Sequence, residues 1–529
     1  MILTDAAALV QTDASADGRV VIIGAGAVGI FLAAQLDRLG RESVIIEAGD
    51  FALNSFDPES FASVGRPNEG LRIGRSRAVG GTTNLWGGQL VEFQPADFAG
   101  RDWIPGSRWP VSYEQVAAHY PQTYERLGIL AAQQSDQAVL RSIGATAPSL
   151  GDGLEYFLTR WMRVPNFARL FESTLRGSPR VRLLTGFAAV GFDASPLDPS
   201  RVLAVRVADR SGRRSTIRGD QFVLAAGTVE ISRLLLTAAA DPSWICPWRH
   251  NPNVGAYFQD HLCGRVGSLR PLNKKVFFRT FATIARGPDK YQPKIRLTSE
   301  ALAGAPLYNT QGIVLFENSV SEHLVFLKQF LRAATSGRRI GSLGDILRGL
   351  GPAFRYLPPL AWRYLVEHRV FVPSGSQVFL SAQCEHGPTS GSRIRIDPHR
   401  RDALGLPATI LDWQLRGDEL PSILQFAIRA DRALRAAGLA ELDIDPELRE
   451  LKPSFLNTMK DVYHQSGGAV MGESERDGVV DQDLRVFGTR NLSVAGSAVF
   501  RTTSNANTTF NALALASRLA DHLGQLRRV

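Results

Sequence analysis

Apolar and polar positions follow two different periods in the first window of the chain. The run Arg19–Ile23 is apolar after its first residue, as in a short buried strand, and Ser43–Glu47 is a second run of this kind. Between them, Ile30–Leu39 has apolar residues at helical spacing, and the turn Gly24–Gly29 leads into it. The window therefore predicts a β-α-β unit.

The rest of the N-terminal half shows the same two patterns. Apolar runs predict strands at Val181–Thr185, Val202–Asp209 and Gln221–Leu224, and helical spacing predicts helices at Ser112–Leu127, Asn166–Arg176 and Glu230–Ala238. Ser112 and Gln115 have the spacing of a capping box at the start of the first helix. The polar and glycine-rich stretch Phe51–Gly88 predicts a long loop, which is unusual in a compact domain unless it has a function.

From about Gly264 to Trp413 the pattern changes to alternating strands, for example Lys294–Leu297 and Gln377–Ser381. A helical, basic insert interrupts these strands at Glu322–His368. The remaining part predicts an amphipathic helix at Asp418–Ala437, a loop at Tyr463–Gly472, a strand at Leu492–Ala495 and a helix at Thr508–Leu526. The sequence contains no internal repeat or low-complexity tract.

Chain length and composition limit the class of protein. With 529 residues and 44% hydrophobic residues, the chain is long enough for a large core and for two or three domains. Cys246, Cys263 and Cys384 lie far apart, so the sequence predicts neither a disulfide framework nor a metal site, and it fits a reducing compartment. Met1–Gly18 has no basic leader, and no stretch has the length of a transmembrane helix. We expect a cytoplasmic protein, with export alongside a signal-carrying partner as the exception known for some redox enzymes.

The charge is basic but dispersed. The formal net charge of +9 at pH 7 is spread along the chain, without a Lys/Arg run interleaved with aromatic residues, so we expect no nucleic-acid partner. The segment from Val320 to Val372 holds eight Lys and Arg residues against three Asp and Glu residues, with Phe, Leu and Trp between them. We interpret this insert as a lid with a solvated basic face, and the open alternative is a surface for a membrane or a protein partner.

The glycine turn has the spacing of a dinucleotide site. Gly24, Gly26 and Gly29 form a G-x-G-x-x-G that leaves a strand and opens a helix. The first glycine permits the tight turn, the second lets the backbone approach a pyrophosphate, and the third lets the helix pack closely on the strand. Glu47 ends the second strand 23 residues after Gly24, where an acidic residue accepts ribose hydroxyls and disfavours NADP. This motif alone does not separate NAD from FAD.

A second glycine-rich segment carries a more specific pattern. The segment Arg77–Gly88, which reads RAVGGTTNLWGG, resembles the flavin-contacting signature of the glucose–methanol–choline (GMC) oxidoreductases. In that family, paired glycines and hydroxyl residues bring the backbone against the flavin and the pyrophosphate, an approach that a Cβ would block. The resemblance implies contacts with FAD from Arg77, Gly80, Gly81, Thr82, Thr83, Asn84, Trp86 and Gly87.

Further segments resemble the same family in its order along the chain, namely Leu224–Glu230, Val254–His261, Ser392–Pro407 and Tyr463–Thr509. The resemblance implies an α/β fold: a Rossmann-like FAD-binding domain of the p-hydroxybenzoate-hydroxylase-like type, plus an α+β substrate-binding domain with a large sheet. It divides the chain into a first FAD-binding part at 1–263, a substrate-binding domain at 264–455 with the basic insert near 322–368, and a C-terminal FAD-binding part at 456–529 that completes the active site. It also adds to the FAD-contacting residues Ala226, Gly227, Gly496, Ser497, Thr508 and Thr509.

Two departures from the family's pattern bear on the cofactor and the active site. Some sugar oxidases of the family carry a histidine in the first signature that bonds covalently to the flavin, whereas this chain has Asn84 and Leu85 there. We therefore expect FAD to be bound non-covalently. The last motif of the family often reads Asn-Pro-Thr, and here it is Asn507-Thr508-Thr509, which keeps the asparagine and loses the proline.

The resemblance makes His464 and Asn507 the candidate catalytic residues. Alcohol oxidation by a flavin needs a base for the hydroxyl proton while the carbinol hydrogen leaves as hydride, and a neutral imidazole suits this step because its pKa lies near the working pH. His464 lies in the loop before the final FAD strand and would be that base. Asn507 would hold the substrate oxygen, and it could also be the N-cap of the last helix. The histidines without a second signal are interpreted as structural, among them His261, His323, His368 and His386.

This His–Asn pair does not select the substrate. It resembles the pair of pyranose oxidases and bacterial sugar dehydrogenases, and also that of cholesterol oxidases. We expect an alcohol group on a sugar, glycoside or polyol, with a sterol or other bulky alcohol as the alternative. A hypothesis of another class is a non-catalytic flavoprotein or partner-binding subunit, against which the intact pair argues. The electron acceptor stays open between oxygen, a quinone and a protein, and the oligomeric state is open as well.

Overall fold

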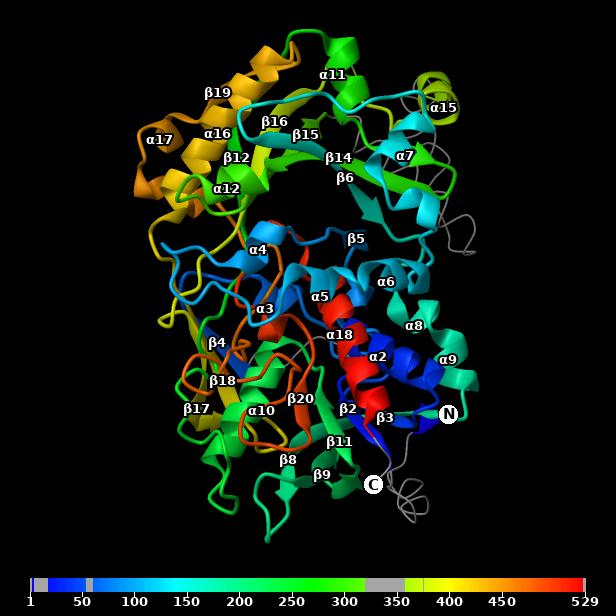
Figure 1. Cartoon of the computed structure of the whole chain (residues 1–529), viewed down its shortest axis with the longest axis vertical. Coiled ribbons are helices and arrows are strands. Elements are labelled where there is room, and N and C mark those ends of the chain that lie inside the picture. Colours follow the sequence, from blue (N-terminus) through cyan, green and yellow to red (C-terminus); the bar gives the residue numbers. More distant parts are fainter. Residues whose placement is uncertain (1, 4–17, 54–59, 319–356, 374, 527–529) are drawn as a thin grey trace, which may run out of the picture.

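The structure, a computed structural model, describes residues 2–3, 18–53, 60–318, 357–373 and 375–526. Figure 1 shows two sheet-containing halves, one above the other, with short helices between them. The chain crosses between the halves more than once, so each half is assembled from separate pieces of the sequence.

The lower half in Figure 1 is built on a parallel six-stranded sheet with the order β1-β7-β3-β2-β11-β20. Its strands are β1 (Ile2–Leu3), β7 (Val181–Thr185), β3 (Ser43–Glu47), β2 (Val20–Ile23), β11 (Gln221–Leu224) and β20 (Leu492–Val494). Both β2 and β3 are buried along their whole length, as expected for a parallel sheet covered on both faces. Helices α2 (Ala27–Arg38) and α18 (Thr508–Gln525) pack against each other beside this sheet, and α10 (Thr228–Ala240) follows β11.

Two small sheets complete the lower half. One contains β10 (Arg214–Arg218), β9 (Val202–Asp209) and β8 (Phe187–Ala194), and the other contains β17 (Arg393–Arg401), β18 (Pro407–Trp413) and β4 (Phe61–Gly65). Helix α10 packs against strands of both sheets.

The upper half is an eight-stranded, antiparallel sheet. Its strands are β19 (Ala440–Ile444), β12 (Leu262–Pro271), β16 (Gln377–Cys384), β15 (Thr310–Glu317), β14 (Asp289–Leu297), β6 (Leu154–Trp161) and β5 (Gln89–Leu90), in that order, with β13 (Ile284–Arg286) beside β14. Strands β5 and β6 come from before residue 264, so this sheet draws on more of the chain than the segment 264–455.

The two faces of this large sheet differ in chemistry, because successive residues of a strand point to opposite faces. Ile295, Leu380 and Ala382 belong to an apolar cluster that also contains residues of α16 (Glu419–Ala436). The alternate positions are largely polar on β14, β15 and β16, and they include Lys294, Gln311 and Gln383. Helix α16 therefore covers the apolar face, and the polar face is left for the other half of the molecule.

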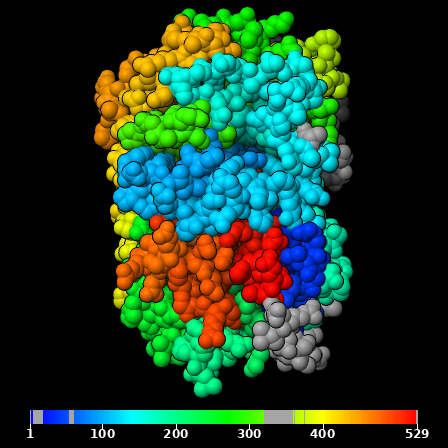
Figure 2. Space-filling model, in the orientation of Figure 1, coloured from blue at the N-terminus to red at the C-terminus, as the bar shows by residue number. Residues whose placement is uncertain are grey.

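A layer of short helices lies between the halves. It contains α4 (Pro95–Ala99), α5 (Tyr113–Ala117) and α6 (Tyr120–Arg126), and Figure 2 shows the segment that carries them as a belt across one face of the molecule. The remaining described α-helices are α3 (Gly70–Ile73), α7 (Asp136–Arg141), α8 (Phe167–Leu170), α9 (Glu172–Gly177), α11 (Lys274–Phe281), α12 (Ser299–Ala303), α15 (Leu357–Leu365) and α17 (Pro446–Arg449).

Three of the local predictions are corrected. The segment 112–127 forms two helices, α5 and α6, because Pro121 has no N–H to continue the first one, although the predicted capping box of Ser112 and Gln115 is present. The segment 166–176 is likewise split into α8 and α9. The stretch 51–88 is not simply a loop, because it contains β4, which pairs with β18, and the short helix α3.

The predicted basic insert falls mostly outside the described residues, which resume in α15. None of the described helices is long and apolar enough to span a bilayer. Within the same described part, no group of three or more His, Cys, Asp or Glu side chains is arranged to hold a metal ion.

Candidate active site

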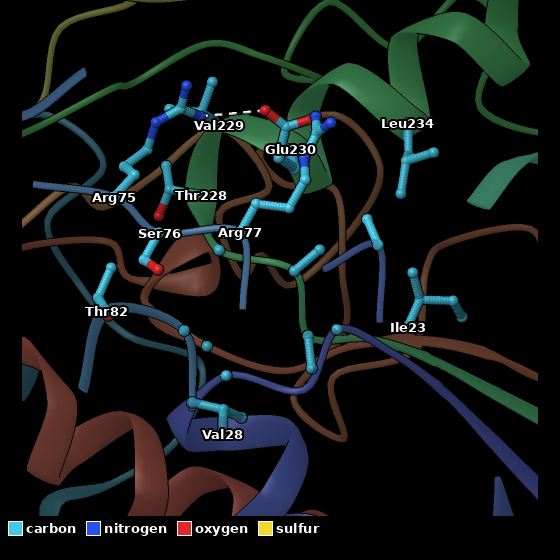
Figure 3. Close-up of a pocket in the computed structure, with 18 of the residues that line it drawn as sticks. Ile23, Val28, Arg75, Ser76, Arg77, Thr82, Thr228, Val229, Glu230 and Leu234 are labelled. Atoms are coloured by element: carbon cyan, nitrogen blue, oxygen red, sulfur yellow. Dashed lines mark hydrogen bonds and ion pairs between the residues drawn. The ribbon is translucent and has the colours of Figure 1, made fainter. Parts of the chain in front are cut away.

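A long cavity begins where the central strands of the parallel sheet end. It is lined by the ends of β2, β3 and β11, by the first residues of α2, α10 and α18, and by residues 74–77 and 81–82 (Figure 3). In Figure 3, Val28 and Thr82 lie on one side of this space, and Arg75 and Glu230 face each other on the opposite side. The predicted FAD-contacting residues that line the cavity are Gly24, Gly26, Glu47, Arg77, Gly81, Thr82, Ala226, Gly227, Gly496, Ser497, Thr508 and Thr509.

The three glycines of the turn have different surroundings. Gly24 has a φ of +108°, and a Cβ there would lie 2.7 Å from the carbonyl oxygen of Ala225. A Cβ on Gly29 would lie 2.0 Å from the Gly24 carbonyl oxygen, so this glycine lets α2 pack against the turn without lining the cavity. A Cβ on Gly26 would meet nothing within 4 Å, because Gly26 faces the open cavity.

The second glycine segment packs directly on this turn. The N–H of Gly80 donates to the Ala25 carbonyl oxygen at 2.8 Å, and a Cβ on Gly81 would lie 2.8 Å from the Gly26 Cα. The amide of Asn84 donates to the carbonyl oxygens of Val79 and Gly81 at 3.1 and 2.9 Å. These contacts hold the segment in place from behind.

Other residues of the signature also hold the loop instead of lining the cavity. The Thr83 hydroxyl donates to the Gly80 carbonyl oxygen at 2.5 Å, and the Trp86 indole donates to the Pro165 carbonyl oxygen at 2.8 Å. A Cβ on Gly87 would lie 2.3 Å from the Trp161 ring. Six predicted FAD-contacting residues therefore lie behind the residues that line the cavity, namely Gly29, Gly80, Thr83, Asn84, Trp86 and Gly87.

Glu47 stands at the end of β3, where the sequence predicted it. Its carboxylate accepts hydrogen bonds from the N–H of Ala25 at 2.9 Å and from the N–H of Gly49 at 2.8 Å. Burial raises the pKa of Glu47 above its ordinary value, and these N–H groups oppose that shift. Glu47 therefore braces the glycine turn and also lines the cavity.

A charged cluster lines the same cavity and was missed by the sequence analysis. Arg75 pairs with Glu230 at 3.0 Å, and Arg233 pairs with Asp402 at 2.8 Å. Burial acts to raise the pKa of Glu230, but the neighbouring arginines outweigh it and hold the pKa below its ordinary value. No local motif marks this cluster, because its residues come from three separate segments of the chain, with Glu230 and Arg233 both on α10.

The cavity fits an elongated dinucleotide such as FAD. At Gly26, Gly227 and Gly496, a Cβ would meet no atom within 4 Å, so three backbone segments leave open space on its lining. The hydroxyl of Ser76, which also lines the cavity, is buried and has no hydrogen-bond partner in the described part of the chain. The helix N-termini of α2, α10 and α18 converge on this space, where their N–H groups can bind an anionic pyrophosphate.

The structure brings His464 and Asn507 together. The Asn507 amide nitrogen lies 3.1 Å from His464 Nε2, and on its other side His464 Nδ1 lies 2.9 Å from His261 Nδ1. Asn507 does occupy the N-cap position of α18, but its side chain makes no capping hydrogen bond. The amide is thus directed to the histidine, while its carbonyl oxygen is buried without a partner among the described residues.

Hydrogen bonding fixes which nitrogen of His464 carries the proton. His261 Nε2 lies 2.8 Å from the Ser504 carbonyl oxygen, which only accepts, so Nε2 of His261 carries its proton and Nδ1 is an acceptor. His464 Nδ1 must then donate to His261, which leaves the lone pair on His464 Nε2. His261, interpreted from the sequence as structural, is therefore a neighbour that orients the candidate base.

The surroundings keep both imidazoles neutral. Burial is the largest cause that holds the pKa of His464 well below its ordinary value, and the charge of nearby Lys294 acts in the same direction. Burial lowers the pKa of His261 to about 4. The neutral form of His464 is the one that can accept a proton.

Strained backbone surrounds this pair. Tyr257, Tyr463 and Ser504 have φ values of +62°, +65° and +56°, in the left-handed region that side chains with a Cβ rarely occupy. Tyr463 precedes His464, and the Ser504 carbonyl oxygen fixes His261. Such strain persists where packing over-determines the backbone, and it is common at functional sites.

A buried ionic network supports the loop that carries Asn507. The guanidinium of Arg101 makes two hydrogen bonds to Glu385, at 2.7 and 2.8 Å, and Glu385 accepts from the Ser504 N–H at 3.3 Å. The Asn309 amide donates to the Ser504 hydroxyl at 3.1 Å and to Asp97 at 2.8 Å. This network ties the loop to the belt and to the large sheet.

Two family models match the chain. One, described as GMC oxidoreductase, matches residues 388–516, and the other, described as pyridine nucleotide-disulphide oxidoreductase, matches residues 19–66. The 2-methyl-1,2-propanediol dehydrogenase of Mycolicibacterium austroafricanum is 23% identical over 494 residues, which cover 84% of this chain and 80% of that protein. The fructose dehydrogenase large subunit of Gluconobacter japonicus is 28% identical over 134 residues, which cover 25% of this chain and 23% of that protein.

Solved structures share the fold over almost the whole chain. The pyridoxine 4-oxidase of Mesorbium loti has a TM-score of 0.54 at 19% identity and covers 95% of this chain and 98% of its own. A formate oxidase has a TM-score of 0.55 at 14% identity, covering 96% and 99%. A fungal aryl-alcohol oxidase has a TM-score of 0.55 at 16% identity, covering 97% and 99%. The solved structures confirm the fold class that the sequence motifs indicated, and the GMC oxidoreductase model matches the C-terminal part of the chain.

Proposed function

We propose that this chain is an FAD-dependent oxidoreductase of the GMC type that acts on CH–OH groups, and that it oxidises an alcohol group of a sugar, glycoside or polyol. The reaction rests on one observation above all. His464 Nε2 carries a lone pair and lies 3.1 Å from the amide of Asn507, beside a cavity that fits FAD. This proposal replaces the alternative of a non-catalytic flavoprotein or partner-binding subunit.

The chain's own residues supply proton transfer and orientation. When bound, FAD supplies the hydride acceptor. His464 Nε2 accepts the hydroxyl proton of the alcohol, since burial keeps this imidazole neutral. Asn507 donates a hydrogen bond to the alcohol oxygen, and its unpartnered carbonyl oxygen accepts one from a neighbouring hydroxyl. His261 keeps the proton of His464 on Nδ1, so that Nε2 keeps the lone pair that takes the hydroxyl proton.

Two considerations support a polyhydroxylated substrate over a sterol. The relatives named above include dehydrogenases of a diol and of fructose. The polar face of the large sheet carries Gln89, Thr159 and Gln292, whose side chains are already joined by hydrogen bonds of 2.7 and 2.8 Å. Such a surface matches hydroxyl groups, whereas a sterol requires an apolar wall.

Non-covalent attachment of FAD is part of the proposal. Asn84 stands near the position where a covalent histidine would be expected, and its side chain is engaged with the backbone of its own loop and with Asn166. Acid denaturation should therefore release FAD into the supernatant. Flavin that stays with the precipitated polypeptide would contradict this part of the proposal.

The function is tested by anaerobic reduction of the bound flavin with a panel of sugars, glycosides, polyols and sterols. We expect flavin bleaching with members of the first three groups. Bleaching by sterols alone would replace the proposed substrate class by the alternative one. Repeating the active substrates with oxygen, a quinone or a dye as oxidant then identifies the electron acceptor.

A further inference from the structure

Lys294 is a buried cation-forming group that the proposed mechanism does not use. Its side chain is 1% exposed and lies on β14, on the polar face of the large sheet. Its amine donates one hydrogen bond, to the amide oxygen of Gln89 at 3.2 Å, and it has no ion-pair partner among the described residues. An ammonium group buried in this way is costly unless an anion joins it.

The register of the sheet places further polar groups around Lys294. Gln311 on β15 is opposite Arg296 of β14 and opposite Gln383 of β16, and directly opposite residues of antiparallel strands share a face. Lys294 precedes Arg296 by two residues, so it shares this face as well. Both amide atoms of Gln311 are buried without a hydrogen-bond partner in the part of the chain that the structure describes.

The same face reaches the catalytic loops. Gln383 donates to the Asn505 carbonyl oxygen at 2.9 Å, two residues before Asn507. The side chain of Asn505 is fully buried, and neither of its amide atoms has a partner among the described residues. Lys294 is also close enough for its charge to act on His464. An amine without an ion-pair partner and two amides without hydrogen-bond partners among the described residues therefore lie on this polar face and on the loop that carries Asn507.

We infer that Lys294 binds a carboxylate on the substrate, so that the enzyme acts on a polyhydroxylated acid, such as an aldonate or a uronide. The inference rests on the proposed function and names the substrate class more narrowly. The amides of Gln311 and Asn505 both donate and accept, as sugar hydroxyls do, and they bind the rest of the molecule. The carboxylate supplies the missing ion-pair partner of Lys294.

The ionisation of Lys294 gives a second consequence. Burial lowers the pKa of Lys294 to about 7, and its charge interacts with the Cys263 thiol on β12 and with His464. Arg296, on its own strand, is paired with Glu155. At pH 8 the free enzyme therefore holds mostly neutral amine at Lys294. A bound carboxylate raises that pKa, so binding of the acid takes up a proton.

The first experiment compares matched substrates, an alditol against the aldonate of the same configuration and a methyl glycoside against its uronide. We expect KM to be lower for the acid of each pair. Lys294→Met should raise KM for the acid about 10–100-fold and leave the neutral partner within about threefold. Gln311→Leu should weaken both members alike, and Lys275→Met, which removes an exposed positive charge, should change neither.

The outcomes separate the inference from the proposed function. If neutral polyols bleach the flavin better than the acids, or if Lys294→Met affects both members equally, the carboxylate role is wrong and the proposed function stands. If neither member of any pair bleaches the flavin while a sterol does, both fail.

A second experiment uses the wild-type protein and does not depend on how Lys294→Met folds. Enzyme reduced with dithionite is titrated with the aldonate by calorimetry at pH 8 in two buffers of different ionisation enthalpy. We expect uptake approaching one proton per bound acid, and none for the alditol. Binding of the acid without proton uptake would overturn the role of Lys294.

Discussion

The cofactor cavity and the surroundings of the His464–Asn507 pair are built in different ways. Around the cavity, the decisive features belong to the backbone. A Cβ on Gly24 or Gly81 would collide with neighbouring backbone, and a Cβ on Gly26 would take up open space in the cavity. Around His464, the decisive features are side chains with defined hydrogen bonds, and polar atoms of the surrounding amides stay unpaired. A site made of backbone is damaged by adding atoms, whereas a site made of side chains is damaged by removing them.

The largest effect is expected at the His464–Asn507 pair. His464→Ala should slow flavin reduction by about 10²–10⁴-fold, because a positioned base is lost, while FAD stays bound. The measurement is anaerobic stopped-flow at saturating substrate. His250→Ala, at an exposed histidine, is the matched control. A His464 variant that holds FAD and bleaches at the wild-type rate would show that another group takes the proton.

In the cavity, adding a single methyl group should empty the site. Gly24→Ala places a Cβ 2.7 Å from the Ala225 carbonyl oxygen, whereas Gly40→Ala, also at a positive φ, meets nothing within 4 Å. Both variants should lose about 1–3 kcal/mol of stability from backbone strain. FAD occupancy after dialysis should fall only for Gly24→Ala. Equal occupancy in the two variants would mean that the turn does not carry the cofactor.

Glu47 sharpens the comparison, because it is a side chain that supports a backbone site. Glu47→Ala should weaken FAD binding by about 1.5–3 kcal/mol, since charged hydrogen bonds of this size are lost. The measurement is the dissociation constant of FAD, and Glu42→Ala, at an exposed glutamate, is the control. An unchanged constant would reduce Glu47 to a strand-end residue without a role in binding.

The smallest effect is expected at His261, which acts through His464. His261→Phe removes the acceptor of the His464 N–H and should slow flavin reduction about 10-fold. With His261 neutral, this change also removes the acceptor that stabilises the imidazolium of His464, so the pKa of His464 should fall further. Because the neutral imidazole is the active form, the acid limb of the rate–pH profile should then move to lower pH. A rate loss without this movement would indicate a merely structural role.

The same contrast explains what the sequence could predict. The turn Gly24–Gly29 and Glu47 lie within one β-α-β unit, and their spacing alone predicts their place. His261 and His464 lie 203 positions apart along the chain and meet through loop geometry that no local pattern encodes. The sequence predicted only that Lys294 belongs to a strand. Which side chains surround it depends on the register of β14 and β15, which no local pattern shows. The split of the helix at Pro121 could have been predicted from the proline itself.

The order of strands in the parallel sheet has a consequence for biosynthesis. Strand β11 lies between β2 and β20, and α18 packs on α2, so elements that are made late complete a layer begun by elements that are made early. Until then the outer edge of β11 is unpaired, and an open strand edge invites aggregation. Ser497 and Thr508 arrive at the cavity with those same elements. FAD loading is therefore expected only after β20 and α18 have been made, and nascent protein should depend on chaperones more than its finished fold implies.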